Sequence, residues 1–306
     1  MRRVTVSGTS QLEKADMKLA SFGEIIWDIY GEQRKIGGAP LNICAHASIY
    51  GFDSYLISAV GDDELGKEAL NIINGFGINT KYIASLPFLP TGRCIVSLNE
   101  KGIPTYDISK NVAYDRISAI EKLSGFDVLC MGTLSLREEH NLIVLNKIIN
   151  DSEFSEIYAD LNIRPPHYSE KSVCFCLENA SILKISDEEL PSVLNLLSIK
   201  YNSVESSAYA ISKLYPKIKL IIITLGDNGS FCLNTETNNT YYSEAVKTKV
   251  VSTVGAGDSF GAAFLASYFK DHDIKRALKI ASHISSYVVS SIEAIPKGAK
   301  AIFESI

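Results

Sequence analysis

Leu220-Ile221-Ile222-Ile223-Thr224 is the stretch that decides the fold class, because it is a short apolar run that ends at a glycine-containing turn. Comparable apolar runs occupy 128–131, 157–160 and 182–185, and helical patterns fall between and after these runs, at about 138–150, 203–214, 258–269 and 274–290. Apolar strands that alternate with helices predict a parallel α/β sheet covered on both faces. Ligands of such sheets bind beyond the carboxyl ends of the strands, so the functional residues are expected in those loops.

The N-terminal part of the chain continues this alternation and then changes in character. We predict a buried strand at 17–29, a helix at 40–51 and a second strand at 54–60. A second helix, capped by Asp62 or Asp63, is expected to run to about residue 75. Two further strands are expected at 93–98 and 105–108, around the turn-forming residues 99–102. They form a candidate hairpin that projects from the main body and is completed by residues near 30–35.

Composition limits the class of protein. The chain has 306 residues, of which 46% are hydrophobic and 21% charged, and its net charge is −5. That length suffices for one large domain, or for a domain with a smaller appendage. No lysine- or arginine-rich run predicts a nucleic-acid partner, and no apolar run is long enough to cross a bilayer. Residues 1–17 lack the apolar stretch of a secretory signal, so a soluble, cytoplasmic protein is expected.

Cysteine and histidine residues offer little chemistry. Most of the six cysteines lie in apolar segments, and no Cys or His pair at ligand spacing accompanies Cys174 and Cys176, so we predict structural thiols. Two histidines, His46 and His283, fall in apolar helical stretches and are expected in the core or a cleft wall. The remaining three are expected to be exposed: His140, His167 and His272.

The strongest local feature is the small-residue turn Gly255-Ala256-Gly257 before Asp258. Small residues let the backbone approach a ligand, and the helix that follows points its unpaired amides and positive dipole end at the turn. An anion such as a transferring phosphoryl group would be stabilised there, and the Asp258 carboxylate could accept a proton from an attacking hydroxyl. Taken alone, the same residues also fit an ordinary tight helix entry.

Two further segments have residue types that suit a sugar. Gly37-Gly38-Ala39-Pro40-Leu41-Asn42 combines glycines with an amide that both donates and accepts, and Asp28 precedes it at a strand end. In Asp160-Leu161-Asn162-Ile163-Arg164, alternation puts Asp160, Asn162 and Arg164 on one side, where Arg164 could hold a phosphate or a sugar oxygen. The alternative interpretation of the first segment is a loop that its glycines make flexible. The alternative interpretation of the second segment is a cluster of surface ion pairs.

Two more strand ends could serve a nucleotide and its metal. Thr224-Leu225-Gly226-Asp227-Asn228-Gly229 could form a nucleotide-binding turn or simply lead into a strand at 230–233. The segment from Lys184 to Glu189 ends its strand in an acidic cluster, to which hydrated Mg²⁺ could bind indirectly. Acidic residues at a helix start are the alternative explanation.

These five features, in this order, resemble the ribokinase-like (PfkB) carbohydrate kinase family over about residues 18–300, and within it the bacterial fructokinases. The two most specific segments are 37–51 and 252–260. Further likeness lies in Gly23-Glu24-Ile25-Ile26-Trp27-Asp28, Pro90-Thr91-Gly92, Asn111-Val112-Ala113-Tyr114-Asp115, Gly132-Thr133-Leu134 and Asp160-Leu161-Asn162-Ile163-Arg164.

The resemblance implies one domain, 1–306, with a Rossmann-like three-layer αβα core, a mostly parallel sheet and a small β-sheet lid inserted at about 30–36 and 87–109. In the family the lid closes over the sugar and often forms a dimer interface, which predicts a homodimer. The implied activity is transfer of the γ-phosphate of ATP to a primary hydroxyl of a hexose, most closely fructose. Mg²⁺ and, in many members, a monovalent cation (K⁺) take part.

The resemblance also implies a role for each matching residue. Asp258 matches the base, Gly255, Ala256 and Gly257 match the anion hole, and Arg164 matches a residue near substrate and phosphate. The sugar contacts are expected from Asp28, Gly38, Asn42 and Asn162. The nucleotide contacts are expected from Thr224, Gly226, Gly229, Lys184 and Ser282. Glu189 matches the acidic residue that organises Mg²⁺ through water.

Four positions depart from the family pattern. Ser252 stands where an Asp is usual, beside the loop that binds the monovalent cation, and Ser186 replaces the Asn of an Asn-x-x-Glu element. Ser282 and Glu293 replace the Asn and Gly of fructokinases. These changes bear on cation dependence, Mg²⁺ binding and the adenine pocket, but none removes the base or the anion hole.

Two alternatives to a fructokinase-like enzyme stay open. The acceptor could be ribose, 2-keto-3-deoxygluconate or a nucleoside, since lid side chains set the choice of sugar. The chain could also be a non-catalytic sugar-binding regulator, although a protein freed from catalysis has no need of Asp258 or Arg164.

Overall fold

The computed structural model describes residues 17–98 and 104–306 and confirms the predicted α/β class. A nine-stranded sheet has the strand order β13-β12-β11-β10-β9-β8-β1-β4-β5. Neighbouring strands are parallel except at β11–β12 and β12–β13, which are antiparallel. A separate small sheet has the order β3-β2-β6-β7.

The bounds of the elements are as follows. The large sheet contains β1 (Lys18–Phe22), β4 (Asp53–Gly61), β5 (Ile83–Leu86), β8 (Val128–Met131), β9 (Glu156–Asp160), β10 (Ile182–Ser186), β11 (Leu220–Thr224), β12 (Ser230–Asn234) and β13 (Asn239–Ser243). The small sheet contains β2 (Ile26–Tyr30), β3 (Gln33–Gly37), β6 (Gly92–Leu98) and β7 (Pro104–Ile108). The helices are α1 (Ala39–Ile49), α2 (Glu64–Gly75), α3 (Glu139–Asp151), α4 (Glu170–Asn179), α5 (Leu190–Leu196), α6 (Val204–Leu214), α7 (Ala256–Asp271), α8 (Ile274–Val289) and α9 (Ala299–Ser305).

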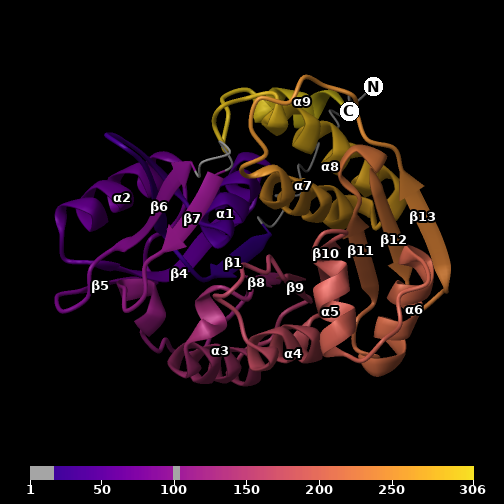
Figure 1. Ribbon diagram of the computed structural model, residues 1–306, viewed down its shortest axis with the longest axis horizontal. Coiled ribbons are helices and arrows are strands. Elements are labelled where there is room, and N and C mark those ends of the chain that lie inside the picture. The colour runs from indigo at the N-terminus through magenta and orange to yellow at the C-terminus, as the bar shows by residue number, and fades with distance from the viewer. Residues whose placement is uncertain (1–16, 99–103) are drawn as a thin grey trace, which may run out of the picture.

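Helices cover the large sheet on both faces, which gives three layers (Figure 1). One apolar cluster packs the sheet against α3, α4, α5 and α6, and a second packs its other face against α1, α7, α8 and α9. A third cluster joins α1, α2 and β4 to Trp27 of the small sheet. This is the arrangement that continuous apolar strands require, because both sides of each strand must be buried.

Most predicted elements are confirmed within a few residues, but the strand predicted over 17–29 is wrong. It is two strands: β1 lies inside the large sheet, and β2 begins the small sheet. The chain turns at Gly23, whose φ is 151°, with the Pro40 ring packed directly against it. A continuous apolar pattern predicted the burial of β1 and of Ile26 and Trp27 at the start of β2, but the rest of β2 is only partly buried or exposed. The pattern could not show that the two strands belong to different sheets.

The small sheet also differs from its predicted limits of 30–36 and 87–109. It includes all of β2 from Ile26, which pairs in parallel with β6. Three helices and two strands had not been predicted: α4, α5, α9, β5 and β13. The turn predicted at 99–102 lies outside the described residues.

No helix in the described part of the chain is long and apolar enough to cross a membrane. All six cysteines are free thiols, and all except Cys174 are buried. His46 is fully buried, as predicted. His167, predicted to be exposed, is 9% exposed and contacts Arg137.

Candidate active site

The carboxyl ends of β1, β8, β9, β10 and β11 lie along one edge of the large sheet, and the candidate residues gather there. The N-terminus of α7 faces the same edge. Gly255 precedes that helix with a φ of 79°, a left-handed conformation that favours glycine. A Cβ at this position would lie 2.7 Å from the Cβ of Ala294, so the turn is closely packed. Among the described residues no side chain caps this helix end. The Ala256 amide already donates to the Thr253 carbonyl over 3.2 Å, so the other amides of this first turn are the ones that can bind an anion.

Asp258 lies in the first turn of α7 and meets Asn42 from the first turn of α1. The Asn42 Nδ2 donates to the Asp258 Oδ2 over 2.7 Å, which joins two motifs 216 positions apart. Gly38 brings α1 this close, because its backbone, at a φ of 117°, lies directly against the Glu24 carbonyl. Burial raises the pKa of Asp258 to about 6, and the Asp160 carboxylate adds to the rise. The Asn42 hydrogen bond and the Lys184 and Arg164 cations oppose it.

Two further carboxyl groups face this cleft. Burial raises the pKa of Glu24 to about 7, and the charge of Asp258 adds to the effect. Burial likewise raises the pKa of Asp28 to about 6, although a hydrogen bond with Cys94 and the charge of Arg164 act to lower it. The charge of Arg164 lowers the pKa of all three carboxyl groups. Glu24 was not predicted as a site residue, although its position directly after β1 is a usable signal.

Asn162 and Arg164 reach the cleft from a loop and not from a strand. Strand β9 ends at Asp160, and Asn162 has a φ of 42°, so the predicted side-by-side alternation of these residues is wrong. The left-handed residue turns the chain away from the sheet. Arg164 is exposed, whereas Asp160 is only 3% exposed.

Lys184 lies beneath the anion-binding turn. Its Nζ donates to both carboxylate oxygens of Asp160, over 2.9 and 2.8 Å, and the two side chains are 5% and 4% exposed. The same Nζ is 3.1 Å from the place that a Cβ would take at Gly257. Burial alone would lower the pKa of Lys184, but the carboxylates of Asp160, Glu189 and Asp258 raise it. Lys184 therefore supplies a permanent positive charge below the turn.

Glu189 is held by backbone amides. Its Oε1 accepts from Ile163 N over 2.6 Å and its Oε2 accepts from Ser186 N over 2.8 Å. The Ser186 hydroxyl accepts in return from Glu189 N over 3.2 Å. Within the described ranges no group of three or more His, Cys, Asp or Glu side chains could hold a metal ion. Each carboxylate oxygen retains a lone pair, so Glu189 fits a hydrated cation bound through water.

The residues predicted for the nucleotide form a second group beyond β11. Gly226 and Gly229 bound the turn between β11 and β12, and both have positive φ angles, 53° and 94°. Gly229 packs against the backbone of Ser243. The Ser243 hydroxyl lies 3.3 Å from that of Ser282 on α8. Thr224 ends β11 beside this turn.

The small sheet turns one face toward the cleft. Asp28 pairs in register with Lys35 and Cys94, and side chains in register share a face. Tyr30 is two residues after Asp28 on β2, so it lies on the same face as Asp28. Tyr106 is two residues before Ile108 on β7, and Ile108 is in register with Cys94, so Tyr106 lies on this face as well. The two tyrosines are 37% and 56% exposed. Asp28 and Tyr106 both act to raise the pKa of Tyr30, after burial, so these groups are neighbours. Neither tyrosine was predicted, because no local motif marks it.

A histidine supports the anion-binding turn from behind. The His46 Nε2 donates to the Ala294 carbonyl over 2.8 Å, and its Nδ1 lies 3.1 Å from the Tyr50 hydroxyl. Burial lowers the pKa of His46 to about 4, so the ring is neutral. Ala294 in turn packs against Gly255. Sequence reasoning predicted the burial of His46 but not this contact.

An uncapped helix N-terminus, a buried carboxylate bonded to an amide beside it and two further carboxyl groups are features typical of a phosphotransferase that acts on a small hydroxyl compound. The sequence profile of the pfkB family carbohydrate kinases matches residues 11–300, and the chain belongs to that family of carbohydrate kinases. The predicted family is thereby confirmed.

Curated relatives and solved structures agree with this membership. The chain is 26% identical to probable fructokinase-5 of Arabidopsis thaliana, over 91% of this chain and 93% of that protein. It is 27% identical to the 5-dehydro-2-deoxygluconokinase of Listeria monocytogenes, over 85% and 83%. Its fold matches the fructokinase from Vibrio cholerae O395 in fructose, ADP and calcium ion bound form, with a TM-score of 0.76, 19% identity and coverage of 94% and 99%. A putative ribokinase II from E. coli in complex with ATP and Mg²⁺ gives a TM-score of 0.77, 21% identity and coverage of 94% and 98%.

Proposed function

We propose that this carbohydrate kinase transfers the γ-phosphate of ATP to a primary hydroxyl of a hexose, with fructose as the preferred acceptor. One observation carries the proposal: the Asn42 amide donates to the Asp258 carboxylate over 2.7 Å, directly beside the free N-terminus of α7. A base, a hydroxyl-binding amide and an anion site are then within one cleft.

The Asn42 amide is suited to orient a sugar as well as the base. Its Oδ1 is buried and has no hydrogen-bond partner among the described residues. A buried acceptor without a partner is costly, and a sugar hydroxyl would supply the missing donor. Asn42 would thus hold the acceptor hydroxyl and the Asp258 carboxylate together.

Asp258 takes the proton from the attacking hydroxyl in this proposal. With a pKa of about 6 it is mostly deprotonated at neutral pH, yet it is more basic than an ordinary aspartate. Within the turn Gly255-Ala256-Gly257, the amides of the two glycines stabilise the charge on the transferring phosphoryl group, since the Ala256 amide donates to the Thr253 carbonyl. Lys184 below the turn and Arg164 at the cleft add positive charge. Phosphoryl transfer needs mainly alignment and charge stabilisation, so these groups suffice on the protein side.

The nucleotide would lie between the anion-binding turn and the second group of residues. Thr224, Gly226 and Gly229 would contact it from the β11–β12 turn, and Ser282 would do so from α8. Mg²⁺ would neutralise phosphate charge when bound, and Glu189 would hold its water ligands. The reciprocal bonds between Ser186 and Glu189 orient that carboxylate, so Ser186 does not remove the magnesium-binding element.

Fructose is favoured over a sugar acid by the charge of the cleft. Relatives include a 5-dehydro-2-deoxygluconokinase as well as fructokinases. A carboxylate substrate would have to approach Glu24, Asp28 and Asp258. The cations that oppose these charges are Arg164, Lys35 and Lys184, and Lys184 is already paired with Asp160. Like charges placed together in a cleft of low dielectric are unfavourable. A neutral ketose meets no such penalty, and it can donate its hydroxyls to these carboxyl groups.

The small sheet would act as the lid. Tyr30 and Tyr106 on its cleft-facing side would cover the sugar ring and keep water from the phosphoryl group. Exposed apolar side chains on its strands, such as Ile95 at 44%, are consistent with a homodimer through this sheet. A cytoplasmic location and a K⁺ requirement stay predictions from the sequence.

A panel assay tests the proposal. Wild-type protein, ATP and Mg²⁺ are incubated with ketoses, aldoses and sugar acids, and ADP and sugar phosphate are both quantified. The highest kcat/KM is expected for fructose, and Asp258→Asn should lower kcat by about 10²–10⁴-fold. Asp62→Asn, a change at an exposed carboxylate, is the matched control. Absence of any sugar phosphate with every acceptor would overturn the proposal and favour a sugar-binding regulator.

A further inference from the structure

Strands β6 and β7 of the small sheet are attached to the core at one place. Gly92 begins β6, and a Cβ there would be only 2.6 Å from the Tyr114 ring. The preceding Pro90 carbonyl accepts from Ala113 N over 2.8 Å. At the end of β7, Ser109 N donates to Arg93 O over 2.9 Å. The strands therefore enter and leave the small sheet beside one short segment, the 3-10 turn Ala113–Arg116.

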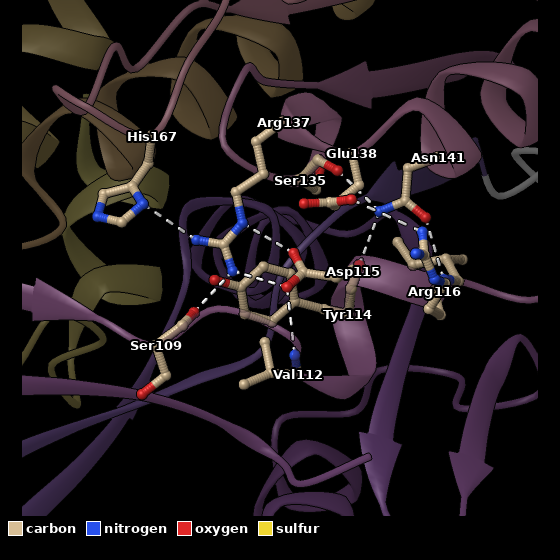
Figure 2. A network of polar contacts seen from close by, with 11 residues as sticks. Ser109, Val112, Tyr114, Asp115, Arg116, Ser135, Arg137, Glu138, Asn141 and His167 are labelled. Atoms are coloured by element: carbon tan, nitrogen blue, oxygen red, sulfur yellow. Dashed lines mark hydrogen bonds and ion pairs between the residues drawn. The ribbon is translucent and has the colours of Figure 1, made fainter. Parts of the chain in front are cut away.

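Arg137 is the centre of this attachment (Figure 2). Its Nε donates to Asp115 Oδ1 over 2.8 Å, and its Nη2 donates both to Asp115 Oδ2 over 2.8 Å and to the Ser109 carbonyl over 2.7 Å. The guanidinium also lies 5.1 Å from the centre of the Tyr114 ring. Arg137 and Asp115 are 6% and 3% exposed. One buried guanidinium thus holds the end of the small sheet to the core.

The remaining nitrogen of this guanidinium reaches toward the loop that carries Arg164. Nη1 of Arg137 lies 3.3 Å from Nδ1 of His167 (Figure 2). An arginine can only donate, so His167 accepts through a neutral ring. Burial and the cations Arg137 and Lys110 lower the pKa of His167, which keeps the ring neutral. The backbone N of His167 donates to the Arg164 carbonyl over 2.6 Å. A short chain of contacts therefore runs from Ser109 through Arg137 and His167 to Arg164.

Stability alone does not account for this arrangement. A buried ion pair contributes little net stability compared with apolar residues of similar volume, but its fixed geometry can specify how segments are placed. The planar guanidinium has donors in a rigid fork, which lysine lacks. Here the fork fixes three segments relative to one another: the end of β7, the 3-10 turn and the loop before α4.

We propose that Arg137 is a positioning residue that couples the small sheet to the Arg164 loop, so that the seating of the sheet over the sugar places the Arg164 guanidinium at the phosphoryl group. The inference rests on the proposed roles of the small sheet and Arg164. Arg137 itself touches neither substrate in this mechanism.

The experiment is a double-mutant cycle with Arg164. Arg137→Lys keeps the charge but loses the fork, and it should lower kcat by about 10–100-fold with little change in the KM for ATP, because misplacing a catalytic group acts on the transition state. The ratio of ADP to sugar phosphate should also rise above one as water reaches the site. In an Arg164→Ala background the same change should cost less than about twofold, because the group it positions is gone.

A control variant and a replacement variant accompany the cycle. Arg116→Lys is the matched control, since Arg116 lies next to Asp115 in the 3-10 turn but forms an exposed pair with Glu138, and it should leave kcat and the product ratio unchanged. If Arg137→Lys does not fold, His167→Ala tests the same coupling, because it removes the link to the Arg164 loop and leaves the Arg137–Asp115 pair intact. It should reproduce the loss of kcat and the dependence on Arg164.

The outcomes distinguish this inference from the proposed function. The coupling would be overturned if Arg137→Lys lowered kcat by the same factor in the Arg164→Ala background as in the wild type. It would also be overturned if Arg137→Lys and Arg116→Lys had equal effects on kcat. Neither result would affect the kinase activity proposed for the wild type. A wild type without sugar phosphate would instead overturn the proposed function. A lower melting temperature of Arg137→Lys with unchanged kcat at 25 °C would show a purely structural role.

Discussion

Lys184 offers the sharpest test of how the site is built, because its two interactions with Asp160 are buried. Lys184→Met removes the cation and leaves the Asp160 carboxylate, 4% exposed, without its partner. Breaking one side of a buried ion pair costs about 3–5 kcal/mol, since the remaining charge is uncompensated. For a chain of 306 residues this corresponds to a fall in melting temperature of about 5–8 °C.

Thermal unfolding measures this loss, and a double variant tests whether the unpaired Asp160 charge causes it. Asp160→Asn combined with Lys184→Met removes both charges and should recover most of the lost melting temperature. Lys67→Met, at an exposed pair with Asp62, should leave the melting temperature nearly unchanged. A loss from Lys184→Met no larger than that control, or no recovery in the double variant, would refute the buried-pair reasoning. It would favour a Lys184 that is free to bind a nucleotide directly.

Four further predictions follow from the same contacts. Asp258→Asn should raise the free energy of unfolding at pH 8 by about 3 kcal/mol, because burial moves the folded-state pKa from 3.8 to about 6, and most of the gain should be lost near pH 4; denaturant titrations at both pH values measure it, and an equal gain at pH 4 would contradict it. The kcat/KM of the wild type should fall as pH drops below about 6, and Asp160→Asn should move this fall to lower pH by removing a carboxylate that raises the pKa of Asp258; an unmoved profile would show that the two do not interact. Gly255→Ala should raise the KM for ATP and destabilise the protein by about 1–3 kcal/mol through its left-handed φ and the contact with Ala294, whereas a neutral effect would mean that the turn is loosely packed. His46→Ala should lower kcat by about tenfold because the segment behind the anion-binding turn loses a hydrogen bond, and wild-type kcat would rule out this support.

Local patterns predicted the core of the fold accurately. The limits of β8 and β11 agree with those predicted, because a buried parallel strand is apolar throughout and is bounded by turn residues. The cap of α2 was also predicted, since Asp63 accepts from Gly66 N. Such features depend on residues close together in the chain.

Features that depend on distant contacts were not predictable in this way. The Lys184–Asp160 pair was not predicted, because nothing in either segment shows that the two side chains lie side by side. The Arg137–Asp115 pair spans 22 positions and matches no motif. Asn162 was predicted to continue a strand alternation, but its left-handed φ ends the pattern at β9. In each case the partner, or the direction of the chain, is set by tertiary packing.

The proposed function assigns to Asp258 the role of base for a neutral hexose held by Asn42. It is tested most directly by measuring sugar binding and phosphoryl transfer on the same preparations of wild type and Asp258→Asn, by calorimetry and by quantifying fructose phosphate from fructose and ATP. Fructose affinity should be similar in the two proteins, while kcat falls by about 10²–10⁴-fold in the variant. A variant that binds fructose and forms its phosphate at the wild-type rate would contradict the claim.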